Sequence, residues 1–234
     1  NHHGLLNEKR LLNHRLIYGY YPDVVTANGD ERETLRQLSD SYLYKDLFIW
    51  NKINKSEKLV KLLQALAFQV GNQVSYNELG KTVGLDNETI ESYLQMLEQS
   101  FVIFRLGSFN RNLRTELKKS RKIYFYDNGI RNALIANFQP INLRSDTRAL
   151  WENFLVSERM KYNDYRRHWY NCYFWRTTAQ QEVDYLEESD GQLRAFEFKW
   201  NTKKNNRITK TFTNAYPDAI TAIITPDNYV DFVS

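Results

Sequence analysis

Two carboxylates and one lysine near the C-terminal end of the chain are spaced so that a β-hairpin would bring them together: Asp184, Glu197 and Lys199. The segments 182–186 and 195–200 alternate apolar and charged residues, which is typical of strands. Asp190-Gly191 lies between them and favours a two-residue type I′ turn. The pattern therefore predicts two antiparallel strands joined by a tight turn.

That turn would also fix the register of the two strands. With 190–191 as the turn, Asp184 falls opposite Glu197, and Glu182 falls opposite Lys199. The remaining expected pairs are Ser189 with Gln192, Tyr185 with Phe196, and Val183 with Phe198. A slip of one residue would send Asp184 to the opposite face of the sheet.

The predicted pair of carboxylates calls for a positive charge. Like charges directly opposite one another destabilise a ladder, and carboxylate oxygens are ligands that Mg²⁺ accepts. The spacing is therefore consistent with a magnesium site that has Lys199 beside it. The alternative is a solvated polar face, in which Lys199 bridges to Glu182 for ~0.2–1 kcal/mol. The spacing alone leaves both interpretations open.

Length and composition describe a globular chain. Its 234 residues are enough for one large or two to three small domains, and 42% of them are hydrophobic. No run of about 18 apolar residues occurs, so no membrane span is expected. The single cysteine, Cys172, excludes an intrachain disulfide and favours a cytoplasmic location. The cysteine and four histidines provide no zinc-binding spacing.

Basic residues crowd two short segments, 111–122 and 203–210, although the net charge is only +4. A basic run beside a folded module is a candidate surface for DNA phosphates. It is also compatible with an ordinary solvated face. The residues predicted to bind nucleic acid are Arg111, Arg114, Lys118, Lys119, Arg121 and Lys122.

The order of periodic segments predicts an α+β fold with four parts. Residues 1–55 read as a helical segment, and residues 56–122 as a winged helix-turn-helix with a basic extension. Residues 123–145 read as a connecting strand and helix. Residues 146–234 follow the order helix, three strands, helix, strand, and their last apolar run, 219–224, suits a buried strand.

Local signals place the elements of the winged helix. Ser75 opens a capping box for a short helix, Gly84 makes a tight turn, and Asp86 caps a longer helix. A strand at 101–106 follows. Further along, Asp127 is a candidate cap for the next helix.

The outer face of the longer helix would decide whether this module binds DNA. It carries two glutamates and no basic residue, which argues against tight phosphate contact. A protein–protein or interdomain role is therefore as compatible with the sequence as DNA binding. The outward residues are Asn87, Glu88, Glu91, Ser92 and Gln95.

Two resemblances extend this interpretation. Asp184 followed by Glu197-Phe198-Lys199 resembles the signature of the PD-(D/E)xK nuclease superfamily. Six motifs, taken in order, resemble the C-terminal half of prokaryotic AAA-family ATPases, in which a winged helix and a nuclease-like domain of unknown function follow the ATPase module. The motifs are Tyr18-Gly19-Tyr20-Tyr21-Pro22, Tyr42-Leu43-Tyr44-Lys45-Asp46, Lys122-Ile123-Tyr124-Phe125-Tyr126-Asp127-Asn128-Gly129, Leu150-Trp151-Glu152-Asn153-Phe154, Glu182-Val183-Asp184-Tyr185 and Phe196-Glu197-Phe198-Lys199-Trp200.

The nuclease resemblance implies roles for particular residues. Asp184, Glu197 and the backbone carbonyl of Phe198 would bind Mg²⁺. Lys199 would orient the attacking water or stabilise charge on the phosphate. Glu152 would be an accessory acid that holds a metal-bound water. Together, Glu152, Asp184, Glu197 and Lys199 would form the catalytic set of a magnesium-dependent endonuclease.

The ATPase resemblance implies a larger protein. The chain starts at Asn1 and contains no Gly-x-x-x-x-Gly-Lys-Ser/Thr phosphate loop, so we expect ATP to bind on an ATPase module that precedes it, with residues 1–55 as the end of that module. The first functional hypothesis is a DNA nuclease coupled to the ATPase. The second is a catalytically inactive regulatory or protein-interaction region. The third is a DNA-binding regulator without a metal. All three are compatible with an oligomer.

Overall fold

The computed structural model describes residues 2–27, 29–40, 56–109, 121–201 and 207–234. The chain separates into two compact units. Unit 1 comprises Asn1–Arg105 and Lys122–Phe154, and unit 2 comprises Leu106–Arg121 and Leu155–Ser234. The expected segments 1–55, 56–122 and 123–145 thus fall mainly in unit 1, and 146–234 falls mainly in unit 2. None of the helices in the described ranges is long and apolar enough to cross a membrane.

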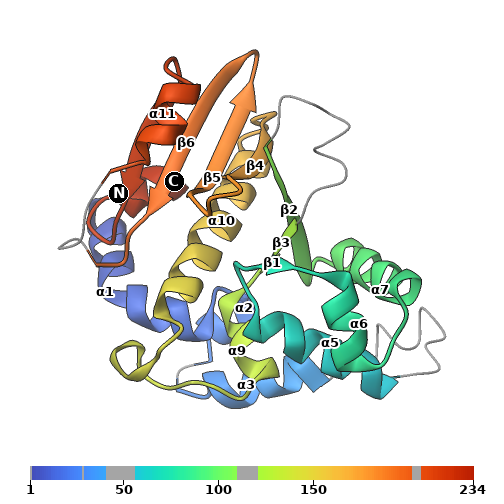
Figure 1. Cartoon of the computed structure of the whole chain (residues 1–234). Coiled ribbons are helices and arrows are strands. Elements are labelled where there is room, and N and C mark those ends of the chain that lie inside the picture. The colour runs from blue at the N-terminus through green and yellow to red at the C-terminus, as the bar shows by residue number, and fades with distance from the viewer. Residues whose placement is uncertain (1, 28, 41–55, 110–120, 202–206) are drawn as a thin grey trace. The chain divides into compact units, whose positions relative to one another are not determined.

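Unit 1 is mainly helical (Figure 1). Its elements are α1 (His2–Tyr18), α2 (Pro22–Val25), α3 (Glu31–Leu38), α5 (Ser56–Phe68), β1 (Gln73–Val74), α6 (Tyr76–Val83), α7 (Asn87–Gln99), the start of β2 (Ile103–Ser108), β3 (Arg121–Phe125), α9 (Asn128–Leu134), the short 3-10 helix η2 (Ile141–Leu143) and the start of α10 (Thr147–Tyr165). The core gathers the leucines of α5 with apolar residues of α6, α7, β3 and α9.

The predicted helix boundaries of unit 1 follow from local chemistry. Ser75 accepts a hydrogen bond from the backbone N–H of Glu78, and Asp86 accepts one from that of Thr89, so each caps its helix as predicted. Gly84 ends α6 with a φ of 72°, in the left-handed region that glycine enters without steric cost.

Unit 2 is built on the sheet. It contains the end of β2, the rest of α10, β4 (Asn171–Arg176), β5 (Glu182–Ser189), β6 (Gln192–Phe198), α11 (Lys210–Ala215), β7 (Ile220–Ile224) and α12 (Tyr229–Val233). Strands β4, β5 and β6 are antiparallel, while β2 is parallel to β4 and β7 is parallel to β6. The order of the described strands is β1-β3-β2-β4-β5-β6-β7, so the chain has a mixed α+β fold with a seven-stranded mixed sheet.

The β5–β6 hairpin has the predicted register. Ser189 pairs with Gln192 and Tyr185 pairs with Phe196. Asp190 and Gly191 both have positive φ, 54° and 77°, as a type I′ turn requires. Turn chemistry and alternation therefore determine this pairing, as expected.

Helices cover both faces of the hairpin. Phe212 of α11 packs in a cluster with Leu186 and Ala195. On the opposite face, Phe232 of α12 lies 4.8 Å from the ring of Phe196 and 6.2 Å from that of Tyr185. The faces differ because successive side chains of a strand point to opposite sides.

The last strand differs from the prediction. Strand β7 stands at the end of the sheet order and not within it, and Ile220 is 54% exposed. The expected buried strand at 219–224 is therefore an edge strand that is only partly covered. The apolar run predicted a strand that is buried on both faces, but such a run does not indicate where the strand lies in the order of the sheet.

Candidate functional site

Asp184 lies in β5 as a buried carboxylate that bonds the backbone of β6. Only 1% of it is exposed, and its Oδ2 accepts a hydrogen bond of 2.7 Å from the backbone N–H of Phe198. The recorded β5–β6 pairs end at Tyr185 and Phe196, so this carboxylate bonds with β6 just beyond the last of them. Continuing the register by one pair would place Asp184 opposite Glu197, as predicted.

Glu197 is the second predicted carboxylate, and half of its hydrogen-bonding capacity is unused. It is 8% exposed, and Lys199 donates a 2.6 Å hydrogen bond to its Oε1. Its Oε2 is buried and has no hydrogen-bond partner among the described residues. An unsatisfied buried acceptor costs about 1–3 kcal/mol, and more when charged. Such an atom therefore requires a physical explanation, and a bound cation is one.

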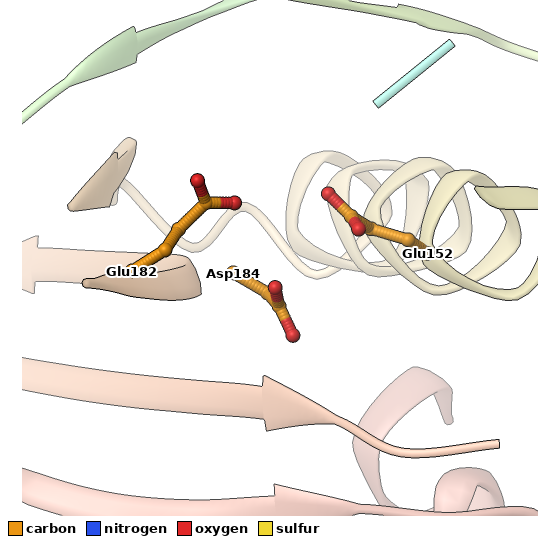
Figure 2. A group of neighbouring side chains, drawn as sticks. All are labelled: Glu152, Glu182 and Asp184. Atoms are coloured by element: carbon orange, nitrogen blue, oxygen red, sulfur yellow. The ribbon is translucent and has the colours of Figure 1, made fainter. Parts of the chain in front are cut away.

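Figure 2 labels three acidic side chains: Glu182 and Asp184 of β5, in unit 2, and Glu152 of α10, in unit 1. Glu182 had no assigned role in the sequence interpretation. The signal that could have found it is its spacing of two residues from Asp184, which puts both side chains on one face of a strand.

The cation partners differ from those expected. Glu182 was predicted to lie opposite Lys199, but its ion pair is with Arg176 of β4, at 3.5 Å. Arg176 is the residue that pairs with Glu182 across the β4–β5 ladder. Lys199 instead bonds the glutamate two residues before it, Glu197.

Lys122 is a correction to the predicted DNA-binding surface. It is only 2% exposed, and its Nζ donates a 2.9 Å hydrogen bond to Glu152 Oε1, which also accepts one from the Tyr124 hydroxyl at 2.8 Å. Strand β3 is buried along nearly its whole length, so a lysine within it must be paired inside the unit. Arg121 is half-buried. The other four predicted residues, Arg111, Arg114, Lys118 and Lys119, lie outside the described residues.

The outward face of α7 is less acidic than the sequence indicated. Asn87, Glu88, Ser92 and Gln95 are exposed as predicted, but Glu91 forms an ion pair of 2.7 Å with Arg105 of β2.

Arg105 also bonds Glu98 and the Tyr76 hydroxyl. Burial lowers the pKa of Arg105, but the hydrogen bonds that it donates to Glu98, Glu91 and Tyr76 outweigh this effect and raise the pKa above its usual value. Of the two glutamates that argued against phosphate contact by α7, Glu91 is therefore neutralised by Arg105.

Several motif residues meet in a buried polar network of unit 1. Asp127 caps α9 and also accepts a 2.7 Å hydrogen bond from the backbone N–H of Tyr20. Asn128 donates to the carbonyls of Leu16 and Leu150. These contacts tie the end of α1 to α9 and α10, so the motif residues Asp127 and Asn128 have structural tasks here.

Glycine is required where these segments approach one another. A Cβ on Gly129 would lie 2.1 Å from the carbonyl oxygen of Tyr18, and one on Gly19 would lie 2.1 Å from an oxygen of Asp127. Gly19 also has a φ of 74°. Close packing therefore explains why Gly19 and Gly129, each in one of the motifs, are glycines.

A second buried ion pair supports unit 2. Glu187 is 0% exposed, and both of its oxygens accept hydrogen bonds from Arg159 of α10, at 2.7 and 2.9 Å. Asn163 donates to the same carboxylate at 2.7 Å. The nearby thiol of Cys172 has its pKa raised to about 11 by burial, so it stays protonated near neutral pH and is a poor nucleophile.

Comparison with known proteins places this architecture among proteins without an assigned activity. Residues 148–230 match a domain of unknown function, DUF4143, which is found in C-terminal regions associated with AAA ATPases. An uncharacterized protein of Haemophilus influenzae is 29% identical over 124 residues, which are 50% of this chain and 31% of that protein. Uncharacterized proteins of Mycobacterium bovis and Mycobacterium tuberculosis are each 25% identical over 169 residues, 70% of this chain and 37% of theirs.

The chain thus spans about a third of the length of these curated relatives. No solved structure matches it significantly. The family model described as a domain of unknown function, DUF8612, matches residues 9–141, which are more than half of the chain. On that match, the chain belongs to the DUF8612 family.

Proposed function

We propose that unit 2 is a magnesium-dependent nuclease domain in the C-terminal region of an AAA-family ATPase, and that unit 1 contains a DNA-binding winged helix. The main supporting observation is that the buried Oε2 of Glu197 has no hydrogen-bond partner among the described residues. Glu197 directly precedes Phe198, whose backbone N–H donates to Asp184. Carboxylate oxygens suit Mg²⁺ and Mn²⁺. The donor set therefore fits such an ion.

The order of elements supports both parts of the proposal. In the C-terminal part, α10, β4, β5, β6, α11 and β7 follow the helix, three strands, helix and strand expected for the PD-(D/E)xK fold. In the earlier part, α5, β1, α6, α7, β2 and β3 follow the order of a winged helix, and β3 lies between β1 and β2 in the sheet. The match of residues 148–230 to DUF4143 is compatible with a place beside an ATPase module.

Each residue of the proposed centre has a role that its position supports. Asp184 and Glu197 would hold the metal, with the carbonyl of Phe198 as a further ligand. The ion would polarise the phosphate and lower the pKa of a bound water. Lys199, which is held by Glu197, would keep a positive charge beside the phosphate and orient the water. Glu152 would hold a water of the same ion.

A second candidate function is a catalytically inactive interaction region. Three of the four carboxylates already have a cation: Lys122 bonds Glu152, Arg176 pairs with Glu182, and Lys199 bonds Glu197. The fourth, Asp184, has a backbone donor. Ion pairs of this kind can replace a metal as the compensating charge. This observation favours a scaffold that keeps the hairpin without cleaving DNA.

Calorimetric titration with Mn²⁺ and Mg²⁺ separates the two candidates. We expect wild-type protein to take up metal at millimolar concentration, and Asp184→Asn and Glu197→Gln each to weaken uptake at least ten-fold. An asparagine keeps an acceptor for the Phe198 N–H, so Asp184→Asn should stay folded. Asp218→Asn, an exposed carboxylate of the same unit, is the matched control. Wild-type protein without metal uptake, or with uptake unchanged in both variants, would leave only the interaction region.

Plasmid nicking provides the activity readout. Nicking should require the divalent cation and should be lost in Asp184→Asn, Glu197→Gln and Lys199→Met. Lys199→Met should retain metal binding, because lysine is not a ligand. Nicking that persists in all three variants would assign the activity to a contaminant or another site.

Salt dependence tests the DNA-binding part. The logarithm of affinity for duplex DNA should fall with the logarithm of salt concentration by about 0.9 for each neutralised phosphate. Replacing Lys118 and Lys119 by glutamine should reduce that slope by about 1.8 if each contacts one phosphate. Lys122→Gln removes a buried charge, so any effect it has on binding would come with lost stability. An unchanged slope after the double replacement would reject the 111–121 segment as the phosphate surface.

A further inference from the structure

The turn between α10 and β4 carries a concentration of exposed aromatic and basic side chains. Tyr165 is 85% exposed and Trp169 is 89% exposed. Arg166 and Arg167 lie between them and are also exposed. Burying a tryptophan side chain stabilises a protein, so a tryptophan that is almost fully in solvent beside two exposed arginines indicates a candidate binding surface.

The neighbouring side chains form a continuous row of rings and cations. Each member contacts the next through an edge-to-face or tilted ring contact or through a cation–π contact. The contacts are Arg166 over Tyr162 at 5.5 Å, Tyr162 against His168 at 5.7 Å, His168 against Tyr170 at 5.5 Å, and Arg194 over Tyr170 at 5.2 Å. These five side chains therefore pack against one another, next in sequence to the exposed Tyr165 and Trp169.

The backbone holds this turn in an unusual conformation. The N–H of His168 donates to the carbonyl of Asn163 at 2.8 Å, which closes the end of α10, and Arg167 has a φ of 57°. Glycine is the residue that normally takes this left-handed position after a helix. An arginine there costs roughly 1 kcal/mol of backbone energy. Because Asn163 is itself bonded to the buried Glu187, the turn is anchored to the core.

The charge of the turn is positive. Within residues 162–171 the sequence has two arginines, a histidine and one carboxylate, Asp164. Arg194 of β6, whose guanidinium lies over the Tyr170 ring, adds a third arginine to the same row. A ligand that complements this surface carries distributed negative charge and flat faces that can stack.

From these observations we infer that the aromatic–arginine turn, defined as Tyr165, Arg166, Arg167, Trp169, Tyr170 and Arg194, binds single-stranded nucleic acid. Unpaired bases would stack on Trp169 and Tyr165, and Arg166 and Arg167 would contact phosphates. A duplex keeps its base faces stacked within the helix, so the exposed rings favour a single strand. The inference rests on the proposed function in taking nucleic acid as the substrate of unit 2.

The position of the turn is compatible with a strand that also reaches the acidic residues. Asn171, directly after the turn, pairs with Glu188 in the β4–β5 ladder. Asp184 is four residues away along β5, or about 14 Å at 3.4 Å per residue. The turn would thus hold a single strand on one side of the proposed cleavage point.

Fluorescence anisotropy of a labelled oligothymidylate, recorded with the whole chain in EDTA, tests this inference without metal or cleavage. Loss of one stacked base costs about 1–3 kcal/mol, so Trp169→Ala should weaken binding by about five-fold or more, and Tyr165→Ala similarly. Trp169→Phe should retain most of the affinity. Phe68→Ala, which removes a 68% exposed ring on α5, is the matched control and should have no effect.

Salt dependence gives a second readout on the same turn. Replacing both Arg166 and Arg167 by glutamine should reduce the slope of log affinity against log salt by about 1.4 for a single strand. Arg10→Gln, an exposed arginine of α1, should leave it unchanged. These side chains are exposed, so all variants should melt like wild type.

The outcomes separate this inference from the nuclease proposal. Oligothymidylate binding that is absent in wild type, or unchanged in Trp169→Ala, would overturn the inference. Binding to phosphatidylglycerol vesicles that depends on Trp169, without oligonucleotide binding, would assign the turn to a membrane surface and also overturn it. Failed metal uptake with intact, Trp169-dependent oligonucleotide binding would refute the nuclease proposal alone.

Discussion

The carboxylate of Asp127 supports two contacts, and substitutions can separate them. Its Oδ1 caps α9 through the Ile130 N–H at 3.1 Å, and its Oδ2 binds the Tyr20 N–H at 2.7 Å, 107 residues away in sequence. In Asp127→Asn the amide oxygen can still cap α9, but its NH₂ group would face the Tyr20 N–H. In Asp127→Ala both contacts are lost.

The expected costs follow from these contacts. A buried N–H left without its acceptor costs about 1–3 kcal/mol, which is the loss expected for Asp127→Asn. Loss of an N-cap adds about 1 kcal/mol, so Asp127→Ala should lower the free energy of unfolding by about 2–4 kcal/mol. Asp86→Ala is the matched control, because Asp86 also caps a helix of unit 1 but has only local bonds.

Urea denaturation followed by far-UV circular dichroism measures the series. The expected order of stability is wild type, then Asp127→Asn, then Asp127→Ala, with Asp86→Ala closer to wild type than Asp127→Ala. An Asp127→Asn variant as stable as wild type would show that the Tyr20 contact contributes nothing. If Asp127→Ala lowered the free energy of unfolding no more than Asp86→Ala does, the proposed stabilisation of α1 by Asp127 would be wrong.

Three further substitutions test other contacts. Glu187→Gln should destabilise the protein by about 3–5 kcal/mol, because it leaves the Arg159 charge buried and unpaired, and the double variant Glu187→Leu/Arg159→Met should recover much of that loss in the same urea assay. Gly129→Ala should lower the melting temperature strongly, since its Cβ would lie 2.1 Å from a carbonyl oxygen, whereas Gly107→Ala, whose nearest contact would be 4.0 Å, should be tolerated. Burial raises the pKa of Asp146, but hydrogen bonds from Arg144 and Arg131 outweigh it and hold the pKa at about 2. Asp146 therefore stabilises the fold above about pH 4 and loses that contribution as the pH falls towards 2. Asp146→Asn should lower the free energy of unfolding by about 1–2 kcal/mol at pH 7 and by nearly nothing at pH 2. An equal loss at both pH values would contradict this reasoning.

The sequence predicts best the features that depend on neighbouring residues. The Asp190-Gly191 turn and the alternation around it determined the pairing of Tyr185 with Phe196. The caps at Ser75 and Asp86 were also readable, because a cap bonds a backbone N–H three residues away. In each case the physical cause lies within a few residues of its effect.

The partners of buried charges could not be predicted. Lys122 belongs to a basic run by composition, yet it bonds Glu152, 30 residues away, because its strand is covered. Arg105 neutralises Glu91 across 14 residues, and Arg176 replaces Lys199 as the partner of Glu182. These pairings depend on how elements pack, and neither spacing nor charge density specifies that packing. The edge position of β7 has the same origin.

The bond between Asp184 and the Phe198 N–H has a consequence for how this hairpin evolves. A side chain that closes the end of a strand contributes to folding even when no reaction takes place, so an aspartate or asparagine at 184 would be retained in a relative that lacks the proposed cleavage activity. Glu197 contributes less to the stability of the fold than Asp184, since one of its oxygens has no hydrogen-bond partner among the described residues. Among relatives, replacement at 197 would therefore mark the loss of the proposed cleavage activity sooner than replacement at 184.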